Sequence, residues 1–317
     1  MSLDLAAIRA AHARILPHIK RTPVLTCDTL DAACGARLYF KCENLQEAGA
    51  FKSRGAVNAV FALTDAEAQH GIVCHSSGNH AAAVARAAKL RGVPAYIVMP
   101  QGAPKSKVRN VESYGGQITY CEASLTVREE TCARITAETG AAMVHPFDDY
   151  RVMAGAGTAA LELLEEVPDL DVMLCPVGGG GLLCGTAVAS KGLKPSIRVI
   201  GVEPELASDV AQSFHAGRRI SIPTPATIAD GLRTNCTGEK NFPLIRAHVD
   251  DILTVSEESI VAATREIWAQ LRIVVEPSGV VPFAALREGK VAVHGKRVGL
   301  ILSGGNVDLD TLPWQKK

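Results

Sequence analysis

Lys52 is the residue of this 317-residue chain whose surroundings best suit covalent chemistry. It lies in the run Ala-Phe-Lys-Ser-Arg-Gly at residues 50–55, between an aromatic residue and a glycine, where a strand is expected to lead into a helix. A lysine that is desolvated loses its proton more readily and becomes a nucleophile. Most lysines are solvated surface charges, so Lys52 would be catalytic only if other segments supply the neighbours that a reactive amine needs.

Four consecutive glycines stand between a predicted strand and a predicted helix: Gly178, Gly179, Gly180 and Gly181. The backbone N–H groups of such a turn can face an anion, and the helix N-terminus adds the positive end of its dipole. A simple turn needs only one glycine, so the run predicts a phosphate site. A dinucleotide is the alternative, because Glu203 ends the next strand, but Gly-x-Gly-x-x-Gly is not met here. Residues 155–160 match a looser Gly-x-Gly-x-x-Ala form without a convincing apolar strand before them.

A second polar turn closes a predicted strand and opens a helix, and its residues are Ser76, Ser77, Gly78, Asn79 and His80. Hydroxyls, an amide and N–H groups in this position suit a carboxylate, although a simple helix cap is the alternative. A serine hydrolase is not expected, because no serine has glycine both two residues before and two residues after it. A third turn, Ser303 to Asn306, follows the last predicted strand. Three such turns and one lysine suit a phosphate-bearing ring with a reactive carbonyl.

Short apolar strands alternate with helical patterns along most of the chain, which predicts an α/β fold with parallel sheets flanked by helices. The strands are predicted at residues 37–43, 72–75, 95–99, 117–121, 172–176, 197–202, 252–255 and 298–302. Helices are predicted at residues 4–19, after 52, at 80–90, 104–113, 126–139, 158–166, after 181, and at 257–271. Two sheet-bearing lobes that share one cleft are expected rather than one very wide sheet.

Composition and charge favour a small-molecule partner. Hydrophobic residues make up 47% of the chain and the formal net charge is +0, so there is no basic field to attract nucleic acid or anionic lipid. No apolar stretch approaches the length of a membrane span, and the first residues do not resemble a signal peptide. The nine cysteines contain no Cys-x-x-Cys pair and are expected to be free thiols. We therefore expect a cytoplasmic protein that binds neither nucleic acid nor membrane.

Several motifs, taken in order, resemble the fold-type II family of pyridoxal-phosphate enzymes, in the branch of threonine and serine dehydratases, serine racemases and 3-hydroxyaspartate dehydratases. The resemblance covers nearly the whole chain and rests on residues 40–44, 50–55, 76–80, 178–182, 228–232, 275–279 and 303–306. It implies the two-lobed, tryptophan synthase β-like fold. Residues 1–70 and 149–317 would form the large cofactor-binding lobe and residues 71–148 a small mobile lobe.

The resemblance implies a role for each motif. Lys52 would form the Schiff base with pyridoxal phosphate and later remove the Cα proton, with Phe51 near the ring. Gly178 to Gly181 would hold the phosphate, Asn79 the phenolic oxygen and Ser303 the pyridine nitrogen. A neutral hydroxyl at that nitrogen makes the ring a weaker electron sink than a carboxylate would, which favours prompt β-elimination.

The turn from Ser76 to His80 would bind the substrate carboxylate. Ser77 matches the serine that serine racemases place on the opposite face of the substrate, so racemisation is the alternative activity. Glu203, Ala207 and Asp209 match a divalent-metal segment of this branch, and their oxygen ligands suit Mg²⁺ or Ca²⁺.

Three residues depart from the more common pattern of the family, and they bear on which substrate is bound. Ala82 and Ala156 lie in segments where relatives commonly carry a glutamine, and Ala50 before Phe51 is similar to the hydroxyaspartate-processing members. A substrate side-chain carboxylate would need a cation, for which the candidates are Arg128, Arg151 and Lys105. The expectation is a homodimeric lyase that converts threonine, serine or 3-hydroxyaspartate to a 2-keto acid and ammonia.

Overall fold

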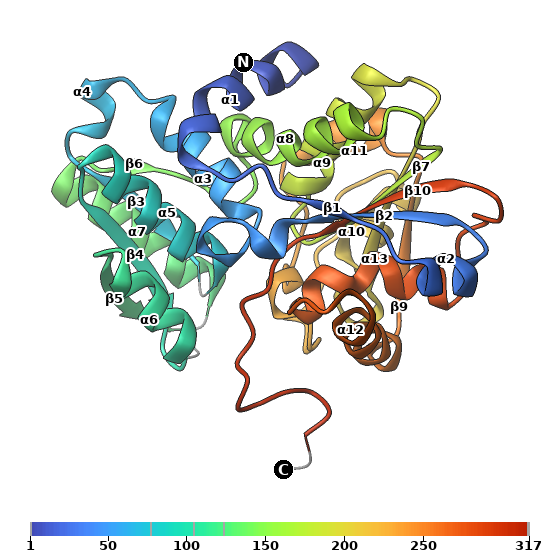
Figure 1. Cartoon of the computed structure of the whole chain (residues 1–317). Helices are drawn as coiled ribbons and strands as arrows, with labels where there is room; N and C mark the ends of the chain where they lie inside the picture. Colours follow the sequence, from blue (N-terminus) through green and yellow to red (C-terminus); the bar gives the residue numbers. More distant parts are fainter. Residues whose placement is uncertain (1, 77, 104, 123, 316–317) are drawn as a thin grey trace.

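The computed structural model describes residues 2–76, 78–103, 105–122 and 124–315, and its strands form two sheets (Figure 1). The larger sheet has the order β1-β2-β10-β7-β8-β9 and the smaller the order β5-β4-β3-β6. The strands are β1 (Val24–Leu25), β2 (Arg37–Cys42), β3 (Ile72–His75), β4 (Ala95–Pro100), β5 (Gln117–Cys121), β6 (Ala142–Met143), β7 (Val172–Pro176), β8 (Arg198–Pro204), β9 (Asp251–Val255) and β10 (Arg297–Leu302). Among these strands only the β1–β2 pair is antiparallel, which confirms the predicted parallel sheets.

Helices cover both faces of each sheet. They are α1 (Leu5–Ile15), α2 (Asp28–Cys34), α3 (Lys52–Phe61), α4 (Asp65–Ala68), α5 (Asn79–Arg91), α6 (Lys105–Ser113), α7 (Leu125–Thr139), α8 (Tyr150–Glu166), α9 (Gly181–Leu193), α10 (Asp209–Ala216), α11 (Asn241–His248), α12 (Glu257–Leu271) and α13 (Pro277–Arg287). Short 3₁₀ turns occupy Leu16–His18, Glu43–Leu45, Glu47–Gly49, Glu205–Ala207 and Asp230–Leu232. No helix in the described ranges has the length and apolar character that crossing a membrane requires.

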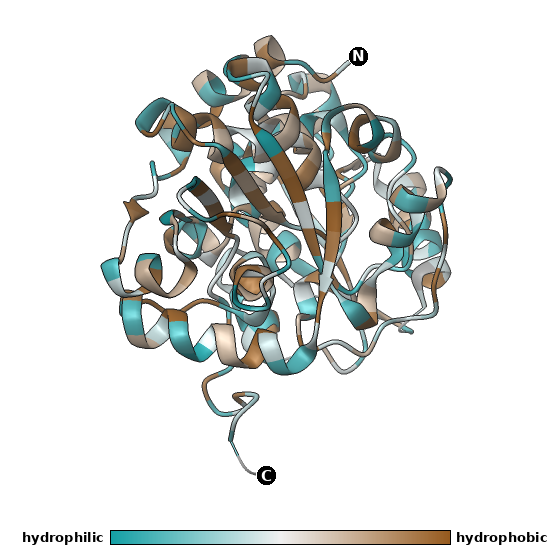
Figure 2. Ribbon diagram, turned by 90° about the vertical axis from the view of Figure 1, so that its right-hand side faces the viewer, coloured by the Kyte–Doolittle hydropathy of each residue, from teal (hydrophilic) through white to brown (hydrophobic). Residues whose placement is uncertain are grey.

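The larger sheet is buried on both faces, which explains why its central strands read as continuous apolar runs. Side chains alternate along β7: Met173 and Cys175 join the core beneath α1, α8 and α9, whereas Val172 and Leu174 join the core beneath α12 and α13. Figure 2 shows these strands largely in brown and the surrounding helices in mixed teal and brown. Because apolar side chains are buried on both faces, the strands are held in place, and so are the polar turns that follow their C-terminal ends.

The smaller sheet follows the same rule. Ile72 and Cys74 of β3 face a core that includes α3 and α5, whereas Val73 faces α7. Helix α3 packs against α5 in this core and also against α8, and its start is tied to the larger sheet by the Phe51 N–H, which donates to the carbonyl of Ser303 at 3.0 Å. Lys52 consequently lies between the two sheets.

Helix α8 begins at Tyr150, eight residues before the predicted start at residue 158. The Asp149 side chain caps it by accepting a hydrogen bond from the Arg151 N–H at 2.7 Å. A Cβ at Gly155 would lie 2.4 Å from the carbonyl oxygen of Arg54, and one at Gly157 would lie 2.7 Å from that of Gly185. The Gly-x-Gly-x-x-Ala match therefore lies inside a helix, where its glycines allow close helix packing.

Candidate active site

A cleft of about 400 Å³ lies between the two sheets, where the polar turns that follow the strands meet. Its lining includes every residue of the predicted cofactor site and substrate turn that the structure describes: Phe51, Lys52, Ser76, Gly78, Asn79, His80, Gly178, Gly179, Gly180, Gly181 and Ser303. The structure thus brings together three turns that are up to about 230 residues apart in sequence. Ser77 lies outside the described residues.

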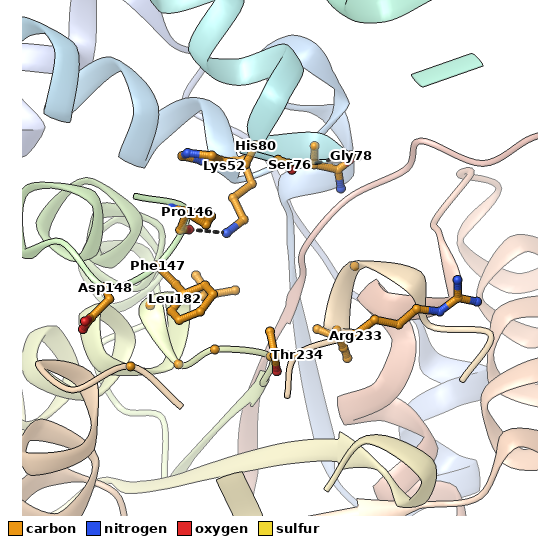
Figure 3. A pocket seen from close by; sticks show the side chains of 18 of the residues that line it. Lys52, Ser76, Gly78, His80, Pro146, Phe147, Asp148, Leu182, Arg233 and Thr234 are labelled. Carbon is orange, nitrogen blue, oxygen red and sulfur yellow. Dashed lines mark hydrogen bonds between the residues drawn. The ribbon is translucent and has the colours of Figure 1, made fainter. Parts of the chain in front are cut away.

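Lys52 is the first residue of α3, and its side chain enters the cleft. Its Nζ donates to the carbonyl oxygen of Pro146 at 2.7 Å (Figure 3). The same atom lies 5.1 Å from the centre of the Phe51 ring. Burial of the amine lowers the pKa of Lys52 to about 8. An amine with that pKa is unprotonated in about one molecule in ten at pH 7, far more often than an ordinary lysine.

The glycine turn joins β7 to α9 and is built for an anion. Among the described residues, the N–H groups of Gly178, Gly179 and Gly180 donate to no backbone carbonyl. The carbonyl of Gly179 instead accepts from the side chains of Thr237, at 3.3 Å, and Asn241, at 3.0 Å. Unpaired N–H groups at the start of a 13-residue helix form the kind of site that phosphate occupies.

Phe147 explains why side chains are excluded from this turn. A Cβ at Gly179 would lie 2.4 Å from the Phe147 ring, and one at Gly181 would lie 3.1 Å from the Phe147 backbone. The loop that contains Pro146 and Phe147 therefore contacts both the lysine and the glycine turn.

Asn79 is held in place by two side chains that the sequence reasoning left without a role. Its Nδ2 donates to Glu276 Oε1 at 2.7 Å, and its Oδ1 accepts from Asn306 Nδ2 at 3.0 Å. Burial, together with the neighbouring charge of Asp230, raises the pKa of Glu276 to about 7. The second N–H of the Asn79 amide remains for a ligand.

The rest of the second turn is ordered by its own hydrogen bonds. Ser76 Oγ accepts from the Gly78 N–H at 3.2 Å, and the buried His80 ring shares a 3.1 Å hydrogen bond with the carbonyl of Val144. Burial, with the nearby charge of Lys52, holds the pKa of His80 well below its ordinary value. The ring is therefore neutral at physiological pH.

The structure distinguishes between the three cations that were candidates for binding a substrate side-chain carboxylate. Arg128 lines the cleft, whereas Arg151 and Lys105 do not. Arg151 forms a 2.7 Å ion pair with Asp149, and Lys105 is exposed. Lys107, which the sequence reasoning missed, also lines the cleft, but it is paired with Asp230 across the gap between α6 and the turn Asp230–Leu232.

The predicted metal ligands lie outside the cleft lining. Glu203 and Asp209 are both fully buried, and Ala207 ends the turn between them. Glu203 Oε2 accepts from the Ala211 N–H at 2.7 Å, and Asp209 Oδ1 accepts from Thr234 Oγ1 at 3.3 Å. Burial, and for Glu203 also the charge of Asp209, raises both pKa values, that of Asp209 to about 7. Two adjacent buried carboxylates of this kind fit a divalent cation.

Behind Lys52, a buried ionic cluster of Lys41, Glu43, Arg54 and Glu162 anchors α3. Arg54 donates two hydrogen bonds to Glu43, at 2.7 and 2.8 Å, and two to Glu162, both at 2.8 Å. Lys41 Nζ donates to Glu162 at 2.7 Å. Although burial raises it, hydrogen bonds from His12 and Arg54 hold the pKa of Glu162 below its ordinary range. Two cations and two carboxylates thus balance in the interior.

The fold and the site define a class: the chain belongs to the pyridoxal-phosphate-dependent enzymes, and the model of that family matches residues 15–304. Within this class it is 52% identical over 305 residues to the β-hydroxyaspartate dehydratase of Paracoccus denitrificans (strain Pd 1222), covering 96% of each chain. It is 49% identical over 317 residues to a serine racemase of Oryza sativa subsp. indica, covering 98% of this chain and 93% of that one. The structure of maize serine racemase matches with a TM-score of 0.95 and 48% identity, over 98% and 96% of the two chains.

The described residues fit pyridoxal phosphate. A lysine with a lowered pKa enters the cleft, an aromatic ring lies beside it, and a turn with unpaired N–H groups is available for the phosphate. The sequence expectation of this family and of the fold-type II architecture is confirmed.

Proposed function

We propose that the chain catalyses the β-elimination of a small β-hydroxy amino acid, threonine, serine or 3-hydroxyaspartate, to a 2-keto acid and ammonia. The observation that carries this proposal is the Lys52 amine, which lies in the cleft with its pKa lowered to about 8 and is held by a carbonyl rather than a carboxylate. The 52% identity to a β-hydroxyaspartate dehydratase supports the same reaction.

Lys52 would hold the cofactor covalently and, once released by the incoming amino group, accept the proton from the substrate Cα. Pyridoxal phosphate supplies the electron-accepting ring that makes this proton acidic. Gly178 to Gly181 would bind its phosphate, and Phe51 would lie beside its ring. Asn79 would bind its phenolic oxygen, and the Ser303 hydroxyl would bind its ring nitrogen.

The turn from Ser76 to His80 would bind the substrate carboxylate at the N-terminus of α5 and so orient the Cα–H bond toward Lys52. Because Ser303 is neutral, charge on the ring would not be stabilised as it would be by a carboxylate, which favours loss of the β-hydroxyl over return of the proton.

Racemisation of serine is the second candidate, favoured by the 49% identity to a serine racemase. It requires an acid on the face of the substrate opposite Lys52, and Ser77 is our candidate for this acid.

The test of function is incubation of the holoenzyme with L-serine, L-threonine and L-threo-3-hydroxyaspartate, with keto acid and D-amino acid measured side by side. Release of keto acid and ammonia in equal amounts is expected. D-serine without pyruvate would contradict the lyase assignment and favour the racemase.

Arg128 is our candidate for binding a side-chain carboxylate of the substrate, because it lines the cleft while Arg151 and Lys105 do not. The substitution Arg128→Gln removes a charge-assisted hydrogen bond. It is expected to lower kcat/KM for 3-hydroxyaspartate by about 10- to 100-fold and to change kcat/KM for serine little. Arg134→Gln, at an exposed position of the same helix, is the control. Equal decreases in kcat/KM for the two substrates would show that Arg128 does not bind the side-chain carboxylate.

We propose a divalent cation, Mg²⁺ or Ca²⁺, at Glu203, Asp209 and the carbonyl of Ala207. A cation would stabilise the charged forms of the two carboxyls, offsetting the burial that raises both pKa values and the charge of Asp209 that further raises the pKa of Glu203. Removing it with a chelator is expected to lower the free energy of unfolding by about 2 to 3 kcal/mol if the ion was present at roughly 100 times its Kd. Calorimetry checks this, and Glu203→Gln should abolish the chelator effect. An unchanged melting temperature on chelation would rule the site out.

The remaining proposals concern the whole molecule. Residues 71–148 would move as a small lobe against residues 1–70 and 149–317. All nine cysteines are free, which supports a reducing, cytoplasmic location. The resemblance to this family is our reason for proposing a homodimer.

A further inference from the structure

Three side chains that the mechanism above does not use converge in the same cleft: His75, Glu129 and His145. His75 ends β3, Glu129 lies on α7 and His145 lies in the loop after β6. One nitrogen or oxygen of each lies within 4.8 Å of the others. His75 is only 4% exposed, and among the described residues its Nε2 has no hydrogen-bond partner.

The spacing leaves room for one small atom at the centre of the cluster. Because the three ligand atoms lie within 4.8 Å of one another, a central atom lies no more than about 2.8 Å from each, a range that includes hydrogen bonds to an oxygen and the shorter bonds to a metal. Two histidines and a carboxylate are also a ligand set that zinc prefers. Whether the cluster binds an oxygen atom or a metal ion therefore depends on which ring nitrogens carry a proton.

The backbone determines the state of His145. Its Nδ1 accepts hydrogen bonds from the N–H groups of Phe147, at 3.3 Å, and Asp148, at 2.8 Å. The proton of the neutral ring is therefore on Nε2, which makes this atom a donor. A metal needs a free lone pair on the ring, and here Nδ1 is engaged while Nε2 is protonated. This tautomer disfavours a metal and favours an oxygen that can accept a hydrogen bond.

Both rings are neutral at physiological pH. Burial, followed by the neighbouring charge of His145, lowers the pKa of His75 to about 4. Burial outweighs the opposing charge of Asp148 and lowers the pKa of His145 to about 4 as well. The cluster thus offers one fixed N–H donor from His145 and acceptors from the Glu129 carboxylate and a His75 nitrogen. A hydroxyl group, which accepts and donates, satisfies this set.

The cluster is next in sequence to residues that contact the catalytic lysine and the proposed carboxylate site. The carbonyl oxygen of Pro146, the residue after His145, accepts a hydrogen bond from the Lys52 amine (Figure 3). Ser76, the residue after His75, begins the turn assigned to the substrate carboxylate. We infer that His75, Glu129 and His145 form a subsite that binds the β-hydroxyl of the substrate, in which His145 donates a hydrogen bond to the hydroxyl oxygen and Glu129 or His75 accepts a hydrogen bond from the hydroxyl O–H. This inference rests on the β-elimination proposed above.

A substrate with a leaving group other than hydroxyl isolates this subsite. β-Chloro-L-alanine should react at the same lysine without needing these hydrogen bonds. For His145→Phe and Glu129→Gln, kcat/KM for L-serine is expected to fall about 10- to 100-fold, the loss of one or two hydrogen bonds in the cleft, where Glu129 is the exposed member of the cluster. Elimination of chloride from β-chloro-L-alanine should change less than about 3-fold on the same reasoning. Glu130→Gln, an exposed glutamate next along α7 that does not line the cleft, is the matched control.

Retained chloroalanine turnover also shows that each variant is folded and carries the cofactor. Equal losses on serine and chloroalanine would overturn the subsite while leaving the β-elimination intact. A zinc ion that the wild type retains and both variants lose would assign the cluster to a metal and overturn the inference too. If the wild type released keto acid from neither substrate, the proposed function and the subsite would both fall.

Discussion

Replacing Lys52 with alanine is expected to lower kcat/KM for every amino acid substrate by about 10⁴-fold or more, because one amine serves as both covalent anchor and proton acceptor. The structure supports this expectation through the lowered pKa of Lys52 and its position in the cleft. Arginine at this position would keep the positive charge but could not lose its proton, so Lys52→Arg should be as inactive as Lys52→Ala. Release of keto acid is the measurement.

The control is Lys105→Ala, at an exposed lysine of α6 outside the cleft lining, which should keep wild-type activity. Residual activity of the Lys52 variants above about one hundredth of wild type would exceed what a lost general base allows and would contradict the role.

Replacing Arg54 with alanine should have the largest effect on stability. Arg54 is fully buried and makes four hydrogen bonds to Glu43 and Glu162. Its removal leaves two buried carboxylates with Lys41 as their remaining partner within the cluster. Loss of one member of a buried pair typically costs about 3 to 5 kcal/mol, and we expect a decrease of that size in the free energy of unfolding, measured by denaturant titration.

Arg134→Ala is the matched control, because Arg134 pairs with Glu138 on an exposed face of α7. An exposed pair of this kind contributes about 0.3 to 0.5 kcal/mol. An Arg54 variant that is destabilised no more than the Arg134 variant would show that the cluster does not anchor α3.

The sequence predicted the features that depend on local pattern. Apolar runs such as Val172–Pro176 predicted strands that are buried on both faces, and the glycine run predicted the turn that joins β7 to α9. The three polar turns each follow a predicted strand, and they were expected to lie together because the two sheet-bearing lobes were expected to share one cleft. The structure places them around a common cleft.

The remaining features depend on contacts between distant segments. Pro146 and Phe147 follow a strand of only two residues, Ala142–Met143, which is too short for a periodic signal, yet they contact Lys52 and Gly179. The ion pair of Lys107 and Asp230 joins residues 123 positions apart, and neither residue has a local pattern that reveals its partner. The glycines of α8 resemble a nucleotide motif in sequence, and only the packing against Arg54 and Gly185 reveals their purpose.

The most direct test of the central claim is to treat the purified holoenzyme with borohydride, digest it and locate the cofactor by peptide mass spectrometry. We predict a yellow protein in which the reduced cofactor is attached to Lys52 alone and no cofactor is fixed in Lys52→Ala. A colourless protein, or cofactor fixed to any lysine other than Lys52, would contradict the account.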